Sequence, residues 1–264
     1  MRGMPARDSC GSSGALTELS AFAEVQAAYE RGDHLDVLRR TEAILAERPG
    51  DDAAHELRAR ALLALGRVRE AESEAENAVR LDPEEIRYRE LLADVFASEG
   101  AHRDAADEYR RIAAGDPRNT EWTVAEARER LGAAQPEMGI EAARRALRLD
   151  PGNGSAQLAL AQGLTRLGQA GLALEAALRA AQLLPDDPAA EEILADARWL
   201  AGDVPTALDA YRALTAGLAG PARSSVVRKA RSLVRKRSNW FGRLVASVPP
   251  LFEIALRNGW LRVS

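Results

Sequence analysis

The chain has 264 residues, of which 46% are hydrophobic and 29% charged, and its net charge at pH 7 is −4. This composition is ordinary for a soluble globular protein and excludes disorder throughout the chain. Aromatic residues make up only 5%, and alanine recurs every few residues, which predicts closely packed helices and no sheet. The single cysteine, Cys10, excludes an intramolecular disulfide and favours a reducing compartment.

The first residues, MRGMPARDSCGSSGALT, contain no continuous apolar stretch of the kind that a secretory signal needs. No window of the sequence reaches the run of about 18 apolar residues that a membrane-spanning helix requires. We therefore expect residues 1–17 to be a disordered leader and the protein to be cytoplasmic, with peripheral attachment to a membrane as the alternative.

A 34-residue period runs through residues 18–220. Proline recurs near the end of the periods, at Pro49, Pro83, Pro117, Pro151 and Pro185. Turn positions carry Gly32, Gly66, Gly100, Ala134, Gly168 and Gly202. Two further columns hold small residues, namely Val37, Ala71, Ala105, Gly139, Ala173 and Ala207, and Val25, Ala59, Ala93, Ala127, Ala161 and Ala195. Because several independent columns agree over six periods, the repeat is established from the sequence.

Each column has a physical role in a pair of antiparallel helices. Glycine permits the tight reversal between the two helices, because it adopts a positive φ without steric cost. Small residues allow helix axes to approach within about 8–10 Å. Proline ends the second helix, since it cannot donate a backbone hydrogen bond and restricts the residue before it. Each period is therefore predicted to be a helix, a turn, a second helix and a stop.

In these residues the chain resembles the tetratricopeptide repeat family, whose 34-residue unit carries small residues, Gly, Ala and Pro at these places. The resemblance is clearest in residues 64–83, 97–117 and 165–185. It implies an all-α fold, a right-handed superhelical solenoid of about six helix-turn-helix repeats. The sequence beyond the repeats predicts an amphipathic basic helix in a C-terminal extension, 221–264. The expected repeats are 18–51, 52–85, 86–119, 120–153, 154–187 and 188–220.

Two repeats depart from the family pattern. In the fourth, Ala134 replaces the turn glycine, Gly139 replaces the packing alanine, and Arg130 stands where an apolar residue is expected. In the first, Val37 and Ile44 are larger than the usual alanines, which an end repeat tolerates because it has only one neighbour.

No set of residues predicts catalysis, a cofactor or a metal ion. The sequence has no nucleophile paired with a base and no glycine-rich phosphate loop between a strand and a helix. The segment 151–155, PGNGS, is interpreted as a turn between repeats, with anion binding at the following helix as the alternative. The histidines His34, His55 and His102 never cluster with other ligand types. We therefore expect a protein that is not an enzyme.

The resemblance implies that function lies on the concave surface, which the first helix of each repeat lines. Residues spaced i, i+3, i+7 and i+10 along such a helix share one face. The predicted partner-binding groove consists of Glu56, Arg60, Arg87, Glu90, Asp94, Arg128, Leu158, Gln162, Asp196 and Trp199. The same face also carries Glu121, Val124, Thr165 and Glu192.

The predicted groove carries charges of both signs and an aromatic residue, Trp199, that we expect to be exposed. A mixed-charge groove suits a charged peptide or helix of a protein partner. The alternative is that these side chains are merely solvated on an open face. A family subclass binds C-terminal carboxylates of chaperones through basic and amide side chains, but Glu56, Glu90 and Asp94 would repel a carboxylate here. The predicted function is a non-catalytic scaffold for protein–protein interaction.

The charge reverses in the C-terminal extension. Residues 1–220 hold 26 basic and 39 acidic side chains, whereas residues 221–264 hold 10 basic side chains and one acid, Glu253. Apolar residues recur there at three- and four-residue steps, at Val226, Ala230, Leu233, Val234, Phe241, Leu244, Val245 and Val248. This pattern predicts an amphipathic helix that Pro249 and Pro250 interrupt.

Three interpretations of the extension remain open. As a cap, it covers the apolar face of the last repeat. As an interfacial helix, it binds an anionic membrane surface and makes the protein a membrane-peripheral adaptor. Nucleic acid binding is the least favoured, because the acidic body of the chain repels phosphate. The predicted lipid or cap contacts are Arg228, Lys229, Arg235, Lys236, Arg237, Trp240 and Phe241.

Overall fold

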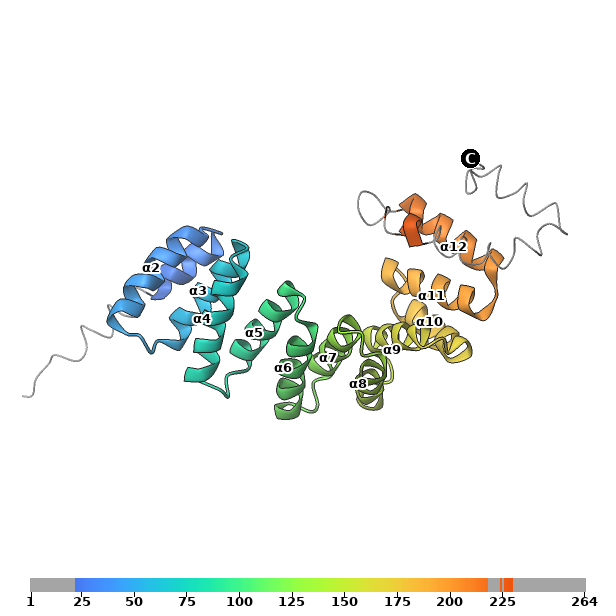
Figure 1. Ribbon diagram of the computed structural model, residues 1–264, viewed down its shortest axis with the longest axis horizontal. Coiled ribbons are helices and arrows are strands. Elements are labelled where there is room, and N and C mark those ends of the chain that lie inside the picture. Colours follow the sequence, from blue (N-terminus) through green and yellow to red (C-terminus); the bar gives the residue numbers. More distant parts are fainter. Residues whose placement is uncertain (1–21, 218–223, 225, 230–264) are drawn as a thin grey trace, which may run out of the picture. The chain divides into compact units, whose positions relative to one another are not determined.

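The computed structural model describes residues 22–217, 224 and 226–229, and the regular structure of these residues is helical (Figure 1). A helical run over 22–30 comes first. It is followed by α2 (His34–Glu47), α3 (Asp52–Ala64), α4 (Val68–Leu81), α5 (Ile86–Glu99), α6 (His102–Gly115), α7 (Thr120–Gly132), α8 (Pro136–Leu149), α9 (Gly154–Arg166), α10 (Ala170–Leu183), α11 (Pro188–Ala201) and α12 (Val204–Gly217). Residues 226–229 are helical as well.

The chain forms two compact units, Met1–Asp150 and Pro151–Ser264. In the first unit, each helix from α2 to α8 contacts the next one along the chain. In the second unit, α9 to α12 do the same, and α11 also contacts α9. We call α5 with α6 the third repeat, α7 with α8 the fourth, and α11 with α12 the sixth. The predicted pairing of helices within each period is confirmed.

The turns between paired helices use the left-handed backbone that the glycine column predicts. Gly32, Gly66, Gly100, Gly168 and Gly202 have φ between 72° and 93°. Ala134 takes this conformation in the fourth repeat, with φ of 55°, and it is the only non-glycine residue with positive φ among those described. A Cβ atom in this conformation is strained, so the turn of the fourth repeat has a local cost that the glycine turns avoid.

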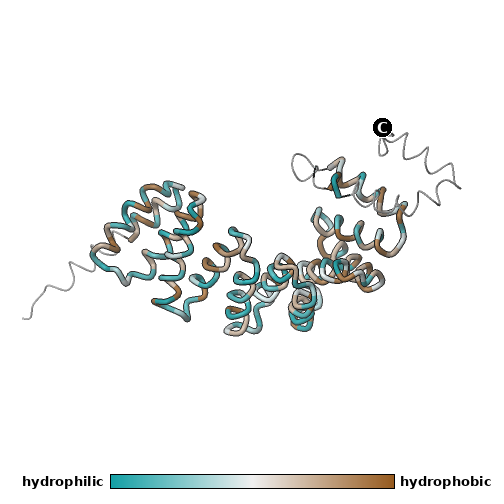
Figure 2. Tube along the Cα trace, in the orientation of Figure 1, coloured by the Kyte–Doolittle hydropathy of each residue, from teal (hydrophilic) through white to brown (hydrophobic). Residues whose placement is uncertain are grey.

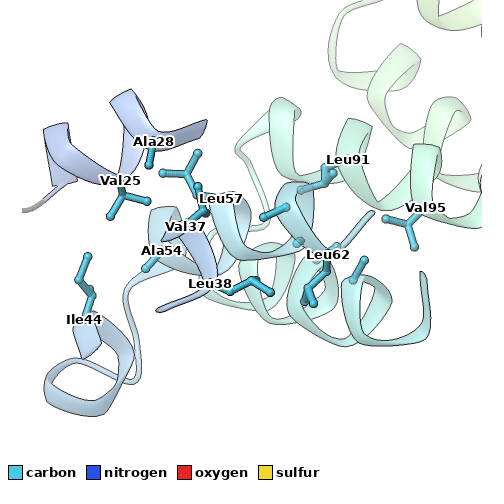
Figure 3. Packing of buried hydrophobic residues seen from close by; sticks show 14 of the residues in the cluster. Val25, Ala28, Val37, Leu38, Ile44, Ala54, Leu57, Leu62, Leu91 and Val95 are labelled. Carbon is cyan, nitrogen blue, oxygen red and sulfur yellow. The ribbon is translucent and has the colours of Figure 1, made fainter. Parts of the chain in front are cut away.

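The columns of small residues form the contacts between helices. The side chains of these columns are fully buried. They are Val25, Ala59, Ala93, Ala127, Ala161 and Ala195 in one column and Val37, Ala71, Ala105, Ala173 and Ala207 in the other. Larger apolar residues fill the spaces around them, and Figure 3 shows Val25, Val37, Leu57, Leu62 and Leu91 in the core of the first unit. The helices therefore pack closely on alanine, with leucine and valine between them.

The fourth repeat compensates for its departures from the pattern. A Cβ atom on Gly139 would lie 2.8 Å from Leu131 Cγ and 3.1 Å from the carbonyl oxygen of Ala127, so α7 and α8 approach too closely for alanine. Arg130 is buried, with 3% exposure, but its guanidinium donates to Asp107 and to Gln135 Oε1. The charge of Arg130 is thus paired inside the repeat stack, where an apolar residue was expected.

Hydrophobic and hydrophilic residues alternate along each helix rather than forming long apolar runs (Figure 2). Within the described part of the chain, no helix combines the length and the apolar character needed to cross a bilayer.

The segment PGNGS forms the turn that leads into α9. The side chain of Asn153 accepts a hydrogen bond of 2.9 Å from the backbone N–H of Ala156, which caps the helix. The Asn153 side chain therefore occupies one of the backbone N–H donors that have no helical partner at the start of α9.

Candidate partner-binding surface

The predicted groove residues all lie on first helices of repeats. Glu56 and Arg60 are on α3, Arg87, Glu90 and Asp94 on α5, and Arg128 on α7. In the second unit, Leu158 and Gln162 are on α9, and Asp196 and Trp199 on α11. We call the surface carrying these residues on α3, α5 and α7 the first-helix face of the first unit. The binding role of these residues stays a prediction.

Glu56 ties the basic residues of α3 and α5 together. Its side chain is 8% exposed and its Oε1 accepts a hydrogen bond of 2.9 Å from Arg60 Nε. Arg87 Nε lies 3.7 Å from the other carboxylate oxygen of Glu56. Glu56 is therefore a buried counterion of two arginines rather than a freely available groove acid.

Arg87 also anchors the packing beneath the first-helix face. Its guanidinium lies 5.0 Å from the centroid of the Tyr88 ring, and its Nη2 donates to the Tyr88 hydroxyl at 3.2 Å. The Tyr88 hydroxyl donates in turn to Asp52 Oδ2 at 3.1 Å. Burial and the hydrogen bond to Asp52 raise the pKa of Tyr88 to about 12. Tyr88 therefore stays protonated near neutral pH and holds α5 against α3.

Glu90 and Asp94 give α5 an acidic face. Asp94 is exposed and its Oδ1 accepts a hydrogen bond of 2.7 Å from the Tyr109 hydroxyl. Partial burial raises the pKa of Glu90, and the nearby carboxylates of Asp94 and Glu121 raise it further, while Arg60 lowers it. Acids thus outnumber bases around Glu90.

Arg128 is the most exposed cation of the first-helix face, with 68% of its side chain accessible. Its Nε lies 3.5 Å from Oε1 of Glu129, the next residue along the chain. Glu129 Oε2 lies 2.8 Å from His102 Nδ1, so that carboxylate is shared with the neighbouring helix. Arg128 therefore projects from α7 and is held to the described part of the chain by one long ion pair.

In the second unit, Asp196 lies against the described residues 226–229 of the C-terminal extension. Asp196 is 8% exposed, its Oδ1 accepts a hydrogen bond from the Tyr211 hydroxyl, and its Oδ2 pairs with Lys229. Lys229 Nζ also lies 2.7 Å from Glu192 Oε1. Burial lowers the pKa of Lys229, but the two carboxylates outweigh this and leave the pKa above its usual value. Lysine therefore remains charged at this site.

The apolar side of the same segment packs on the last repeat. Val226 is 3% exposed and lies in a cluster with Ala195, Ala207 and Tyr211. Trp199 and Leu214 pack against that cluster. Trp199 is consequently half-buried, which corrects the expectation of an exposed aromatic residue.

The predicted lipid or cap contacts are only partly described. Arg228 is exposed, and Lys229 is half-buried in the ion pairs with α11. The other predicted contacts, Arg235, Lys236, Arg237, Trp240 and Phe241, lie outside the described residues.

Several buried ionisable groups outside the first-helix face are paired within the described residues. His55 Nδ1 lies 2.6 Å from Glu74 Oε2 and its Nε2 lies 3.1 Å from the Pro49 carbonyl oxygen. Glu126, which is 3% exposed, forms ion pairs with Arg130 and Arg145. Within the described ranges, no group of three or more His, Cys, Asp or Glu side chains could hold a metal ion.

The sequence reasoning missed the tyrosines that hydrogen-bond the groove acids. A signal was present, because Glu90–Asp94 reads ELLAD and Glu192–Asp196 reads EILAD, and a tyrosine lies 15 residues after each aspartate. Comparison of the repeats at positions outside the consensus columns would have found this match.

A sequence profile described as "Tetratricopeptide repeat" matches the chain at residues 22–86, 57–120, 124–188 and 163–221. No curated protein matches the chain in a sequence search. Among solved structures, a tetratricopeptide repeat protein from Parabacteroides merdae is similar over 81% of this chain and 89% of its own, with 14% identity and a TM-score of 0.68.

Two other solved structures share the fold. MamA from Desulfovibrio magneticus RS-1 is similar over 63% of this chain and 94% of its own, with 20% identity and a TM-score of 0.57. A chain of the APC/C hetero-tetramer Cut9–Hcn1 is similar over 81% of this chain and 42% of its own, with 14% identity and a TM-score of 0.58. Repeats of this kind serve in general as non-catalytic scaffolds that bind protein partners. With its profile matches spanning residues 22–221 and its helices paired accordingly, the chain belongs to the tetratricopeptide repeat family.

Proposed function

We propose that this protein is an interaction scaffold whose first-helix face in the first unit binds a charged peptide or helix of a protein partner. The observation that carries the proposal is the set of accessible charges of both signs on adjacent first helices. Arg87 and Arg128 have side-chain exposures of 51% and 68%, and Asp94 on α5 is exposed as well. A partner with complementary charges gains orientation and a faster association rate from such a surface.

The pairing of Glu56 decides which arginines are suitable for a test. Replacing both Arg60 and Arg87 would leave the buried Glu56 carboxylate without a counterion, and the protein would lose stability together with binding. Replacing Arg87 and Arg128 keeps the 2.9 Å contact between Arg60 and Glu56. The variant R87Q/R128E therefore changes the accessible charge with the least damage to the fold.

The test is a comparison of captured proteins. Immobilised full-length protein and the variant R87Q/R128E are exposed to a lysate of the native host, and retained proteins are identified by mass spectrometry. We expect at least one partner that the unmodified chain retains and the variant loses. The matched control is R110E/R144Q, which makes the same changes at exposed positions on the second helices α6 and α8. Equal retention by all three proteins would refute the proposal.

A second candidate function is a membrane-peripheral adaptor, located in the cytoplasm and attached through the C-terminal extension. The charge reversal of residues 221–264 favours it, because each basic residue near an anionic surface contributes about 1 kcal/mol. Lys229 is already paired with α11, so the lipid contacts would come from the later basic residues.

Sedimentation with vesicles tests this second candidate. We expect the chain to sediment with anionic vesicles at low salt, and the variant R235Q/K236Q/R237Q to remain in solution. Binding should weaken as salt rises, since screening reduces attraction between exposed charges and lipid headgroups. Equal sedimentation with neutral vesicles would count against the adaptor function.

A further inference from the structure

The third and sixth repeats carry the same three polar residues at equivalent positions. Glu90, Asp94 and Tyr109 correspond to Glu192, Asp196 and Tyr211, with three 34-residue periods between them. No other period combines a glutamate, an aspartate and a tyrosine at these positions. The other four periods read Phe22, Gln26 and Thr41; Glu56, Arg60 and Ala75; Val124, Arg128 and Ala143; and Leu158, Gln162 and Ala177.

In the sixth repeat this constellation binds a lysine side chain. The Tyr211 hydroxyl donates to one oxygen of Asp196, which leaves the other oxygen for Lys229 Nζ. Glu192, one helical turn earlier on α11, accepts from the same Nζ at 2.7 Å. An ammonium group carries three donors on one atom, and it therefore satisfies two carboxylates that converge from positions i and i+4 of a helix.

In the third repeat the same hydrogen bond between tyrosine and aspartate forms. The Tyr109 hydroxyl donates to Asp94 Oδ1 at 2.7 Å, just as Tyr211 does to Asp196 Oδ1. Glu90 stands one turn before Asp94 on α5. Among the described residues, no Lys or Arg side chain forms an ion pair with Glu90 or Asp94, and Asp94 is exposed.

The neighbouring cations are directed elsewhere. Arg60 on α3 bonds to Glu56 at 2.9 Å, and Arg128 on α7 lies 3.5 Å from Glu129. Burial raises the pKa of Glu90, the nearby carboxylates of Asp94 and Glu121 raise it further, and Arg60 lowers it. The site therefore has an excess of negative charge at the helix positions that, in the sixth repeat, accept an ammonium group.

We propose that Glu90 and Asp94, with Tyr109 holding Asp94 in place, bind a lysine side chain of a protein partner. This inference rests on the proposed scaffold function and specifies the chemistry of the partner. The ligand has to enter from the accessible side of Asp94, because α7 packs beside α5 and α6 where residues 226–229 pack in the sixth repeat. A carboxylate-bearing ligand is repelled at the same place by Glu90, Asp94 and Glu121.

The test uses a defined probe. A labelled peptide with the sequence of Val227–Leu244, which contains both lysines of the chain, is titrated onto the full-length protein at low salt. We expect E90Q/D94N to bind it about tenfold more weakly, because loss of charge-assisted hydrogen bonds raises the dissociation rate. The single variant E90Q, which leaves the hydrogen bond between Tyr109 and Asp94 intact, should show part of this loss at an undiminished melting temperature.

Matched controls separate ammonium recognition from general attraction between opposite charges. The same peptide with both lysines acetylated is titrated onto the unmodified chain. It should bind there as weakly as the unmodified peptide binds to E90Q/D94N. Glu141, an exposed acid on the second helix α8, provides the control E141Q, which should bind as the unmodified chain does. The proposal would be overturned if the peptide bound E90Q/D94N and the unmodified chain with equal affinity. It would also be overturned if the acetylated and the unmodified peptide bound the unmodified chain with equal affinity.

Two further outcomes are informative. If the full chain forms dimers that E90Q/D94N abolishes, the occupant is a second copy of the chain, and the assignment to a different protein is wrong. If a partner from the host lysate is lost by R87Q/R128E and retained by E90Q/D94N, the lysine site is refuted while the scaffold function stands.

Discussion

The third and sixth repeats share a polar constellation and differ in the segment that packs next to each of them. In the sixth repeat, residues 226–229 place Val226 in an apolar cluster and Lys229 on two carboxylates. In the third repeat, α7 is the next helix, and no cation of the described chain pairs with Glu90 or Asp94. The segment that packs next to a repeat therefore decides whether the acids of that repeat pair within the fold or stay without a cation of the described chain.

The largest expected effect comes from Val226→Asp, which tests the packing of residues 226–229 on the sixth repeat. The new carboxylate would be buried among Ala195, Ala207 and Tyr211 without a partner, so we expect a loss of about 3 kcal/mol from the free energy of unfolding of the second unit. Hydrogen exchange should accelerate in α11 and α12 and stay unchanged in α5 and α6. The half-buried neighbour Val227 provides the control V227D, for which a much smaller loss is expected. An unchanged denaturation midpoint for V226D would show that the extension does not close the sixth repeat.

The second prediction compares the cations themselves. Lys229→Met removes the ammonium group and leaves the buried Asp196 with the hydroxyl of Tyr211 but without its counterion, so we expect a loss of about 2 kcal/mol in the free energy of unfolding. Arg128→Met, on the first-helix face of the first unit, should change the free energy of unfolding by less than about 0.5 kcal/mol because the Arg128 side chain is 68% exposed. Urea denaturation of the two variants checks both values. Equal effects would mean that the two sites are structurally alike.

A third prediction concerns the fourth repeat, which follows the repeat that carries Glu90 and Asp94. Gly139→Ala places a methyl group 2.8 Å from Leu131 Cγ and forces α7 away from α8, which should cost about 1–2 kcal/mol. The loss should appear in the hydrogen exchange of the first unit, and α9 to α12 should be unaffected. The control is Gly171→Ala on α10, where a Cβ atom meets no other atom within 4 Å. Normal stability of G139A would show that the close approach of the helices is not required.

The fold was predictable because its determinants are local and repeat at a fixed spacing. A glycine every 34 residues and buried alanines such as Ala59 and Ala93 identify helix pairs without knowledge of any long-range contact. Arg130 shows the limit of this reasoning. Its burial depends on Asp107, 23 residues earlier, and that pairing exists only once α6 and α7 are packed together.

The candidate site was predictable only in part. The resemblance to the family placed the ten groove residues on first helices, and the structure has them there. Whether each one is available depends on side chains from neighbouring helices. Glu56 is held by Arg60 and Arg87, and Asp196 by Lys229, so these two acids are buried despite standing at groove positions. Column spacing carries no information on such pairings.

The smallest expected effect is also the sharpest test of the comparison, because its sign differs between the two repeats. Burial and neighbouring acids raise the pKa of Glu90 in the folded chain, so the folded state holds a proton more strongly than the unfolded state. Stability from this group is present at low pH and is lost as pH rises through the unfolded and then the folded pKa. At pH 7, Glu90→Gln should therefore raise the free energy of unfolding, by less than about 0.5 kcal/mol because the group is partly solvated.

Glu192→Gln should act in the opposite direction. It removes a carboxylate that accepts from Lys229 Nζ at 2.7 Å, so the free energy of unfolding should fall by up to about 1 kcal/mol at pH 7. Denaturation of both variants at pH 7 and at pH 4 checks the pair, and the gain from E90Q should shrink at the lower pH. An acid whose removal stabilises the protein is retained at a cost to the fold, which is expected of a binding residue and not of a structural one. If E90Q destabilises the protein as E192Q does, Glu90 has a structural counterion, and the lysine site in the third repeat is already filled.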